Sequence, residues 1–346
     1  MSRCLELAAQ GLPSAMPNPA VGAVLVYKDT IIGEGFTSPY GGSHGEVNCI
    51  NSVKDKNKPY ISQSTLYVSL EPCSHTGKTP PCANLIIENK IPKVIIGCVD
   101  TFSLVAGKGI EMLKNKGVDV TIGVLEEECR ELNKRFFTFH EEQRPFVILK
   151  WAQTSDRFIA PDKEFHSQER WITGELTKEL VHKIRSEEMA ILVGKNTVLA
   201  DNPSLTTRNY PGNNPVRIVL DRQLELWKTK NDFSIFNYES NTLIINSISD
   251  FEEGDCKGIK IDFDNEFIKN LLNKLYQENI QSLIVEGGEF TLSSFIASGY
   301  WDEAFVFENE KKFESGVKAP QLNLNPIDTK WVGNDYLSIY KNKVVS

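Results

Sequence analysis

Four residues among the first 82 have the types and spacing of a catalytic metal site: His44, Glu46, Cys73 and Cys82. Catalytic zinc takes three protein ligands from nitrogen and sulfur donors and keeps a further position for water. His44, Cys73 and Cys82 supply such a donor set, and a helix N-terminus lowers the pKa of a thiol placed there. The sequence therefore predicts a zinc site that activates water near neutral pH.

Glu46 lies two residues after His44, and we expect it to move protons and not to bind the metal. The pattern His-x-Glu followed by Pro-Cys and a second Cys is typical of zinc deaminases, although the gap between the cysteines is longer here. Two alternatives stay open. The cysteines could be ordinary buried core residues, or the zinc could be structural with His75 as its fourth ligand. The presence of Glu46 favours the catalytic interpretation.

Longer blocks of sequence extend this pattern through the chain. The chain resembles the bifunctional riboflavin-biosynthesis deaminase/reductase family, in which the longer gap between the cysteines is usual. The first half carries the blocks Pro17-Asn18-Pro19-Ala20-Val21-Gly22, His44-Gly45-Glu46 and Leu70-Glu71-Pro72-Cys73-Ser74-His75-Thr76-Gly77-Lys78-Thr79-Pro80-Pro81-Cys82. The second half carries Arg144-Pro145-Phe146-Val147, Trp171-Ile172-Thr173-Gly174, Ile191-Leu192-Val193-Gly194, Asp201-Asn202-Pro203-Ser204-Leu205 and Val285-Glu286-Gly287-Gly288.

The resemblance implies an α/β protein of two domains. A cytidine-deaminase-like three-layer α/β/α domain over residues 1–143 would hold one zinc ion. A dihydrofolate-reductase-like α/β domain over residues 144–346 would use NADPH. The first would deaminate a diaminopyrimidinone ribosylamino phosphate, and the second would reduce its ribosyl group to ribityl. The family also suggests a homo-oligomer, either a dimer or a tetramer.

The resemblance also assigns substrate contacts to Asn18, Lys78 and Asp100 in the first half. The amide of Asn18 has paired donor and acceptor groups that suit the edge of a ring, and Lys78 could meet a phosphate as a point charge. Each has an ordinary alternative. Asn18 could be a turn residue, Lys78 an exposed lysine and Asp100 a helix cap.

Ten residues of the second half correspond to family binding positions. The cofactor positions are Ala152, Trp171, Thr197, Asp201 and Gly288, and the substrate positions are Lys150, Arg185, Leu205, Arg208 and Glu286. Guanidinium groups suit a phosphate, although each Arg could equally form a surface pair. Without the family, Gly287-Gly288 would indicate only a tight turn between a strand and a helix. Neither a Rossmann fingerprint nor a P-loop is present.

These residues need elements that hold them, and hydrophobic periodicity predicts alternating strands and helices in both halves. A polar break ending at Pro145 separates the halves. We expect strands over 20–27, 30–36, 64–70, 93–99 and 118–123, with helices over 46–53, 82–89, 108–116 and 126–137. The second half is expected to have strands over 146–152, 189–194, 216–220, 243–246, 282–286 and 303–307, and helices over 176–185 and 266–278. Residues 223–258 are expected to be a variable surface connection with one strand.

Composition narrows the class of protein. The 346 residues carry 38 Lys and Arg against 46 Asp and Glu, a net charge of −8 that does not suit nucleic acid or an anionic membrane. We expect no membrane span and no signal peptide. Seven cysteines suggest free thiols in a reducing cytoplasm.

Arg157 replaces a Gly that is usual in the family, so the alternative function is an active deaminase with an impaired or assembly-only reductase domain.

Overall fold

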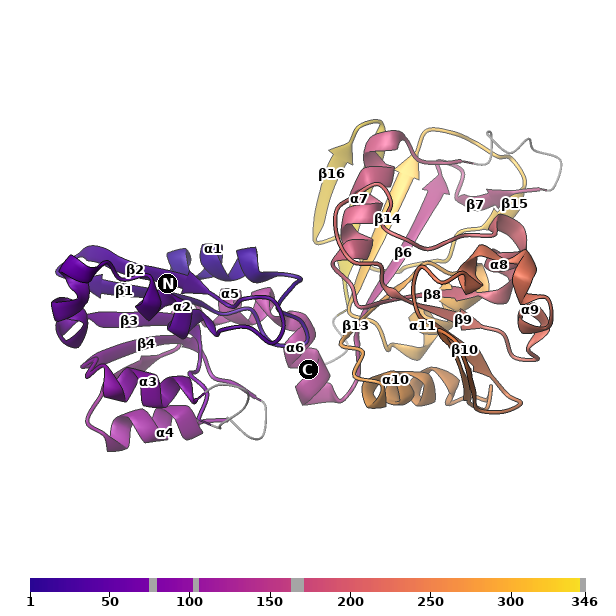
Figure 1. Cartoon of the computed structure of the whole chain (residues 1–346). Helices are drawn as coiled ribbons and strands as arrows, with labels where there is room; N and C mark the ends of the chain where they lie inside the picture. The colour runs from indigo at the N-terminus through magenta and orange to yellow at the C-terminus, as the bar shows by residue number, and fades with distance from the viewer. Residues whose placement is uncertain (75–79, 102–105, 163–170, 343–346) are drawn as a thin grey trace. The chain divides into compact units, whose positions relative to one another are not determined.

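The computed structural model describes residues 1–74, 80–101, 106–162 and 171–342 (Figure 1). The chain divides into two compact units, Met1–Gln143 and Arg144–Ser346. Each unit has its own sheet and its own hydrophobic core. Lys78 and His75, for which the sequence suggests roles, lie outside the described residues.

The first unit is built on a five-stranded sheet with the order β2-β1-β3-β4-β5. β1 is antiparallel to β2 and β3, whereas β3, β4 and β5 are parallel to one another. The strands are β1 (Gly22–Tyr27), β2 (Thr30–Phe36), β3 (Thr65–Leu70), β4 (Lys93–Cys98) and β5 (Asp119–Ile122). The carboxyl ends of β3 and β4 therefore lie side by side, and both precede residues of the predicted site.

Helices cover both faces of this sheet. The helical segments are α1 (Ser2–Gly11), α2 (Gly45–Asn51), η1 (Asp55–Gln63), α3 (Cys82–Glu88), α4 (Lys108–Asn115), α5 (Glu126–Leu132) and α6 (Lys134–Glu142). Side chains alternate along β1, so Ala23 and Leu25 join the core beneath α2, α3 and α4, while Val24 packs with Cys4 and Leu7 of α1. The predicted three-layer α/β/α arrangement is confirmed.

The prediction of one helix over 126–137 was wrong in one respect, because Asn133 separates this region into the two helices α5 and α6. The Asn133 side chain accepts a hydrogen bond from the Ala20 N–H (2.8 Å) and donates one to the Ala20 carbonyl (2.9 Å). This buried pairing holds the segment that enters β1. A contact of this kind spans more than a hundred residues, so helical periodicity could not predict it.

The second unit is built on a ten-stranded sheet with the order β11-β12-β10-β9-β8-β13-β6-β14-β17-β16. The strands from β12 to β14 in this order are parallel, and β11, β17 and β16 are antiparallel to their neighbours. The parallel strands are β6 (Phe146–Thr154), β8 (Ala190–Gly194), β9 (Val216–Leu220), β10 (Thr242–Asn246), β12 (Cys256–Lys260), β13 (Ser282–Val285) and β14 (Glu303–Asn309). The others are β11 (Phe251–Glu253), β16 (Asp328–Val332) and β17 (Asp335–Lys341), and β7 (Phe158–Pro161) pairs with β15 (Gly316–Lys318) in a separate ribbon.

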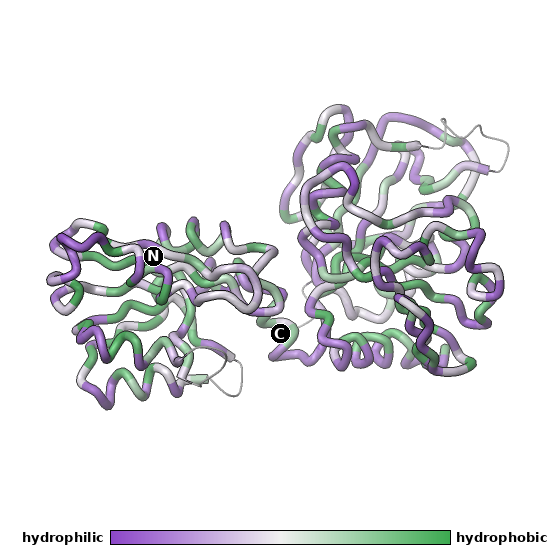
Figure 2. Tube along the Cα trace, viewed as in Figure 1, coloured by the Kyte–Doolittle hydropathy of each residue, from purple (hydrophilic) through white to green (hydrophobic). Residues whose placement is uncertain are grey.

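Helices again cover both faces. Residues of α10 (Phe267–Gln277) and α11 (Glu289–Ser298) pack in one core cluster. Residues of α7 (Glu175–Ser186), α8 (Lys195–Asp201) and α9 (Glu225–Lys228) pack in another. In α10 the buried residues Ile268, Leu271, Leu272 and Leu275 form one stripe, and hydrophilic residues colour much of the rest of the helix in Figure 2.

Residues 223–258 were wrongly predicted as a surface connection with one strand. The segment contains α9, η2 (Lys230–Asp232), η3 (Ser234–Phe236), β10, β11 and the start of β12. Its residues Leu226 and Ile235 are buried in the core. The wholly buried Arg217 of β9 donates hydrogen bonds to the carbonyls of Asn237 and Ser240, which holds this polar segment against the sheet.

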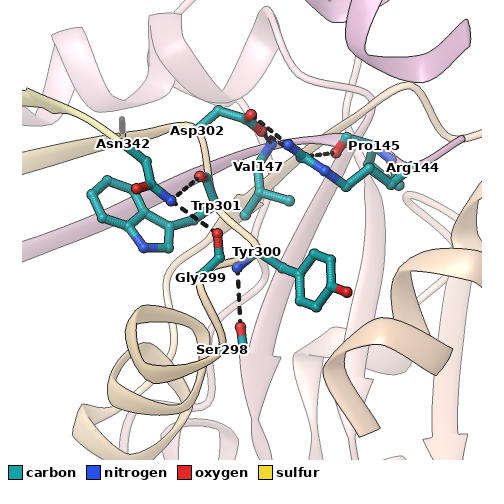
Figure 3. Close-up of polar contacts among 9 residues, drawn as sticks. All are labelled: Arg144, Pro145, Val147, Ser298, Gly299, Tyr300, Trp301, Asp302 and Asn342. Carbon is teal, nitrogen blue, oxygen red and sulfur yellow. Dashed lines mark hydrogen bonds and ion pairs between the residues drawn. The ribbon is translucent and has the colours of Figure 1, made fainter. Parts of the chain in front are cut away.

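A polar junction joins the start of the second unit to later elements (Figure 3). Arg144 forms two hydrogen bonds of 2.7 Å with the Asp302 carboxylate, which also accepts the Val147 N–H (2.6 Å). The Asn342 amide donates to the carbonyls of Gly299 (2.9 Å) and Trp301 (2.8 Å). The first strand β6, the segment that enters β14 and the end of β17 are therefore linked.

Candidate functional sites

The predicted metal ligands come together at the ends of three elements of the first unit. His44 is the residue before α2, Cys73 follows β3, and Cys82 is the first residue of α3. Their ligand atoms all lie within 4.8 Å of one another. The His44 Nδ1 atom is 3.6 Å from the Cys73 sulfur and 3.3 Å from the Cys82 sulfur.

These distances fit a tetrahedral metal. Zinc bonds of about 2.0–2.3 Å place neighbouring ligand atoms about 3.3–3.8 Å apart. Hydrogen bonding by the Cys82 thiol and by His44 outweighs burial and lowers the pKa of Cys73 to about 4. The same hydrogen bond raises the pKa of Cys82. Within the described residues this is the only such cluster of three potential ligands, and its donors suit zinc.

Glu46 lies in the first turn of α2, directly beside the cluster. Its side chain is only 3% exposed. Burial, together with the nearby Cys73, raises the pKa of Glu46 to about 7, and its carboxyl group also hydrogen-bonds with Cys82. A carboxyl group with a pKa near neutrality can both take up and release a proton, which is what general acid–base catalysis requires.

The structure places Asn18 and Asp100 at loop positions of this unit. Asn18 is half-buried, and its N–H donates to the Ala15 carbonyl (3.0 Å). Asp100 is buried just after β4, and its N–H donates to the carboxylate of Glu71 (3.3 Å). Glu71 was missed as a functional candidate, and only its position in the Glu-Pro-Cys run pointed to it.

Three charged residues of the second unit that were predicted to bind substrate also lie close together. Glu286 follows β13, Lys150 lies on β6 and Arg185 lies on α7. The Glu286 Oε2 atom is 3.0 Å from Arg185 Nη2 and 3.9 Å from Lys150 Nζ. Burial raises the pKa of Glu286, but the charges of Arg185 and Lys150 outweigh it and lower the pKa overall. Burial lowers the pKa of Lys150.

Several buried polar atoms in this cluster have no hydrogen-bond partner within the described part of the chain. They are Arg185 Nε, Glu286 Oε1 and His182 Nδ1. Buried polar atoms are nearly always paired, so these atoms are open to an ordered water or to a polar ligand. His182 was missed in the sequence. The available signal was its spacing, because it lies one turn before Arg185 on α7.

Four other predicted residues of the second unit lie near the starts of α8 and α11 and in the loop after α8. A Cβ atom on Gly288, before α11, would lie 3.6 Å from the Thr197 hydroxyl on α8, so these two positions are neighbours. Leu205 is buried, whereas Arg208 is exposed and donates to Ser204 (3.0 Å).

Three cofactor candidates are placed separately: Ala152 is half-buried on β6, Trp171 is exposed before α7, and Asp201 is the exposed last residue of α8. Beside Trp171, a cavity of about 690 Å³ is lined by the loop before α7, the end of β14 and the β16–β17 hairpin. Lys311, which lines this cavity, donates to the Trp171 carbonyl (2.5 Å).

Comparisons with known proteins cover both units. Residues 1–98 match the cytidine and deoxycytidylate deaminase zinc-binding region, and residues 145–309 match the RibD C-terminal domain. The riboflavin biosynthesis protein RibD of Aquifex aeolicus is 38% identical over 99% of this chain and 94% of its own length. The RibD protein of Escherichia coli is 32% identical over 92% of this chain and 89% of its own length.

Solved structures agree with these sequence matches. A Thermotoga maritima protein described as a diaminohydroxyphosphoribosylaminopyrimidine deaminase/5-amino-6-(5-phosphoribosylamino)uracil reductase has a TM-score of 0.88. It is 36% identical, and the match covers 99% of this chain and 97% of that one. RibD of Acinetobacter baumannii has a TM-score of 0.85 at 29% identity, over 98% and 96% of the two chains. The resemblance seen in the sequence is confirmed, and the chain belongs to the RibD family of bifunctional deaminase/reductases of riboflavin biosynthesis.

Proposed function

We propose that residues 1–143 deaminate 2,5-diamino-6-ribosylamino-4(3H)-pyrimidinone 5′-phosphate and that residues 144–346 then reduce its ribosyl group to ribityl with NADPH. The observation that carries the proposal is the cluster of His44, Cys73 and Cys82 with the buried Glu46 beside it. The charged cluster of the second unit supports the reductase step, because it combines buried charges with unpaired polar atoms.

In the deaminase step, His44, Cys73 and Cys82 would hold a zinc ion. That ion supplies Lewis acidity, which makes a water molecule acidic enough to react near neutral pH. Glu46 would take a proton from the water as the water oxygen bonds to the ring carbon, and would deliver that proton to the exocyclic nitrogen. The C–N bond then breaks, ammonia leaves and the oxygen stays on the ring as the carbonyl. Its pKa of about 7 suits both transfers.

The substrate of this step would be held by residues around the metal cluster. Asn18 pairs with an edge of the pyrimidine ring through its amide, and Asp100 accepts a hydrogen bond from a ring substituent. Lys78 meets the phosphate as a point charge. These assignments rest on the correspondence with family positions and on the chemistry of each side chain.

In the reductase step, NADPH supplies the hydride. We assign its binding to Ala152, Trp171, Thr197, Asp201 and Gly288. The neighbouring positions of Gly288 and Thr197 support this assignment, because they bring two of the assigned residues together at the start of α11. The fluorescence of the exposed Trp171 would report cofactor binding directly.

The sugar phosphate would lie over the charged cluster. Glu286 Oε1 has no partner within the described residues and can accept a hydrogen bond from a sugar hydroxyl. Arg185 and Arg208 are suited to the phosphate, and Lys150 and Leu205 line the same site. The hydride would add to C1′ of the ribosyl group, the bond from C1′ to the ring oxygen would break, and that oxygen would take up a proton.

A two-step mass assay tests both halves. The zinc-loaded protein receives the diaminopyrimidinone ribosylamino phosphate, first alone and then with NADPH. Exchange of an imino group for oxygen establishes deamination, and a later gain of two hydrogens establishes reduction. Deamination alone would favour the second candidate, an active deaminase with an impaired or assembly-only reductase domain. The observation behind that candidate is Arg157, a non-Gly residue at φ +62° where the family usually has Gly. If folded, zinc-loaded protein showed neither mass change, the proposal would be overturned.

Two further parts of the proposal concern the state of the protein. None of the described helices is long and apolar enough to cross a membrane. All seven cysteines are free thiols, which fits a reducing cytoplasm, and we propose that location. A homo-oligomer, dimer or tetramer, stays a prediction from the family, and light scattering of the purified protein measures it.

A further inference from the structure

Glu71 is a buried carboxylate between β3 and the metal-binding residue Cys73. Its Oε2 atom accepts hydrogen bonds from the backbone N–H groups of Gly107 (2.9 Å) and Asp100 (3.3 Å). Its Oε1 atom accepts from Gly109 (2.9 Å) and Ile110 (3.2 Å). The side chain is 3% exposed. A buried carboxylate is thus bound by four described backbone donors and no described cation.

The chemistry of this contact is that of a helix cap from a distant residue. Gly109 and Ile110 belong to the first turn of α4, whose free N–H groups form the positive end of the helix dipole. Hydrogen bonds from such groups to a carboxylate are strengthened by its charge. A Cβ atom at Gly109 would collide with the Pro72 carbonyl oxygen, so glycine is needed for α4 to approach the Glu71-Pro72 backbone this closely.

Glu71 is linked to both parts of the proposed deaminase site, to Cys73 through the backbone and to Asp100 through its carboxylate. Pro72, with its restricted backbone, is all that separates Glu71 from Cys73, and the Cys73 carbonyl in turn accepts the N–H of Ala83 in α3. On the other side, Glu71 binds the N–H of Asp100. Movement of the Glu71 side chain would therefore displace a metal ligand and a substrate-binding residue together.

We propose that Glu71 is a positioning residue of the deaminase, which fixes Cys73 for the metal and Asp100 for the substrate. The proposal rests on the proposed function of this unit, and it adds a residue that touches neither metal nor substrate. Residues that orient metal ligands typically contribute about 10–100-fold to metal affinity. Loss of Glu71 should therefore weaken zinc binding and raise the KM of deamination, beyond any loss of stability.

The test is Glu71→Gln in the full-length protein. Glutamine keeps the shape but turns an N–H₂ group towards backbone N–H donors, whichever way the amide lies. We expect zinc affinity, measured by chelator competition, to fall about 10-fold or more. The d–d spectrum of the cobalt-substituted protein should change, the KM of deamination should rise several-fold, and reduction of the deaminated intermediate should be unchanged.

Asp221→Asn is the matched control. Asp221 is a wholly buried carboxylate of the second unit that accepts the N–H groups of Glu225 (2.9 Å), Leu226 (2.9 Å) and Trp227 (3.2 Å) at the start of α9. Its substitution makes the same kind of defect away from the metal residues. We expect a comparable loss of stability with wild-type zinc affinity and deamination KM.

The outcomes separate this proposal from the proposed function. Wild-type zinc affinity, cobalt spectrum and KM in folded Glu71→Gln would show a structural role only and overturn the proposal. If Glu71→Gln does not fold, Glu71→Asp decides instead: it keeps the charge but shortens the reach, so unchanged zinc affinity and KM would overturn the proposal, and intermediate losses would support it. Absence of deamination by the wild-type protein would instead contradict the proposed function.

Discussion

The two sites of this chain are assembled in different ways. In the first unit, side chains at the starts of two helices and after one strand form a cluster whose ligand atoms lie within 4.8 Å. In the second, Lys150, Arg185 and Glu286 come from a strand, a helix and the end of another strand, and they meet through one ion pair and one longer contact. Metal ligation restricts residue types strongly, whereas a charged pocket can be built from common residues. The first site therefore has a sequence signature, and the second depends on topology.

The largest effect that separates the two sites is expected from Glu46→Gln. The substitution keeps the shape of a buried side chain and removes the carboxyl group that we propose moves the proton. General acid–base catalysis contributes about 10²–10⁴-fold, so deamination should fall by at least that range. Zinc content and reduction of the deaminated intermediate should stay at wild-type levels, as metal analysis and NADPH absorbance can show.

The control for this variant is Glu127→Gln, which changes an exposed glutamate on α5 of the same unit. It should leave both reactions unchanged. Normal deamination by Glu46→Gln would mean that another group moves the proton, and loss of both activities would mean that the two sites are not independent.

A smaller effect, a loss of reduction and not of deamination, is expected from Glu286→Gln in the second unit. It leaves the buried charges of Lys150 and Arg185 without their acidic partner. A hydrogen bond to a charged group is worth about 1.5–3 kcal/mol, so kcat/KM of reduction should fall about 10–100-fold. Deamination and zinc content should not change. Reduction at the wild-type rate would exclude Glu286 from the substrate site.

The sequence predicted most of what depends on local pattern. The strand β2 was predicted with its observed bounds, and six of the seven parallel strands of the second unit were predicted from short apolar runs, whereas β12 was missed. Short or exposed elements were missed. The helix α8 buries only Val198, and β16 is exposed along most of its length, so neither has a strong periodic signal.

The sequence also failed to predict side-chain contacts whose partners are backbone groups. The partners of Glu71 are N–H groups, and Asn133 pairs with the backbone of Ala20. Every residue has such groups, so no residue type marks the partner. His182 was missed for a related reason, because its importance comes from burial beside Arg185, and burial of a single histidine cannot be read from the sequence.

His182 also gives the second unit a predicted pH dependence. Burial, followed by the charges of Arg185 and Arg208, lowers its pKa from 6.5 to about 4. As the pH falls from about 6.5 to 4, the unfolded chain takes up a proton that the folded chain does not. The free energy of unfolding should therefore fall with decreasing pH, by up to about 3 kcal/mol at pH 4.

The measurement can be confined to one unit. All five tryptophans lie after residue 144, so intrinsic fluorescence in a urea titration follows the second unit alone. The urea midpoint of the wild-type protein should fall across this pH range more than that of His182→Asn, which cannot titrate. Parallel pH profiles for the two proteins would show that His182 is already accessible to protons in the folded state.

The smallest effect is expected from Arg157→Gly, in the turn between β6 and β7. Arg157 has φ +62°, a conformation that costs a non-Gly residue about 1–2 kcal/mol. Glycine removes that cost, but the greater conformational freedom that it gives the unfolded chain costs about 0.5–1 kcal/mol. The tryptophan-monitored unfolding free energy should therefore rise by at most about 1.5 kcal/mol. For Asn279→Gly, at φ +58° in the same unit, the unfolding free energy should rise less, because asparagine tolerates this conformation.

If Arg157→Gly also increased the rate of reduction with deamination unchanged, the turn at Arg157 would limit the rate of the second reaction. An unchanged rate would mean that the strain at Arg157 is borne by the scaffold and does not reach the charged cluster.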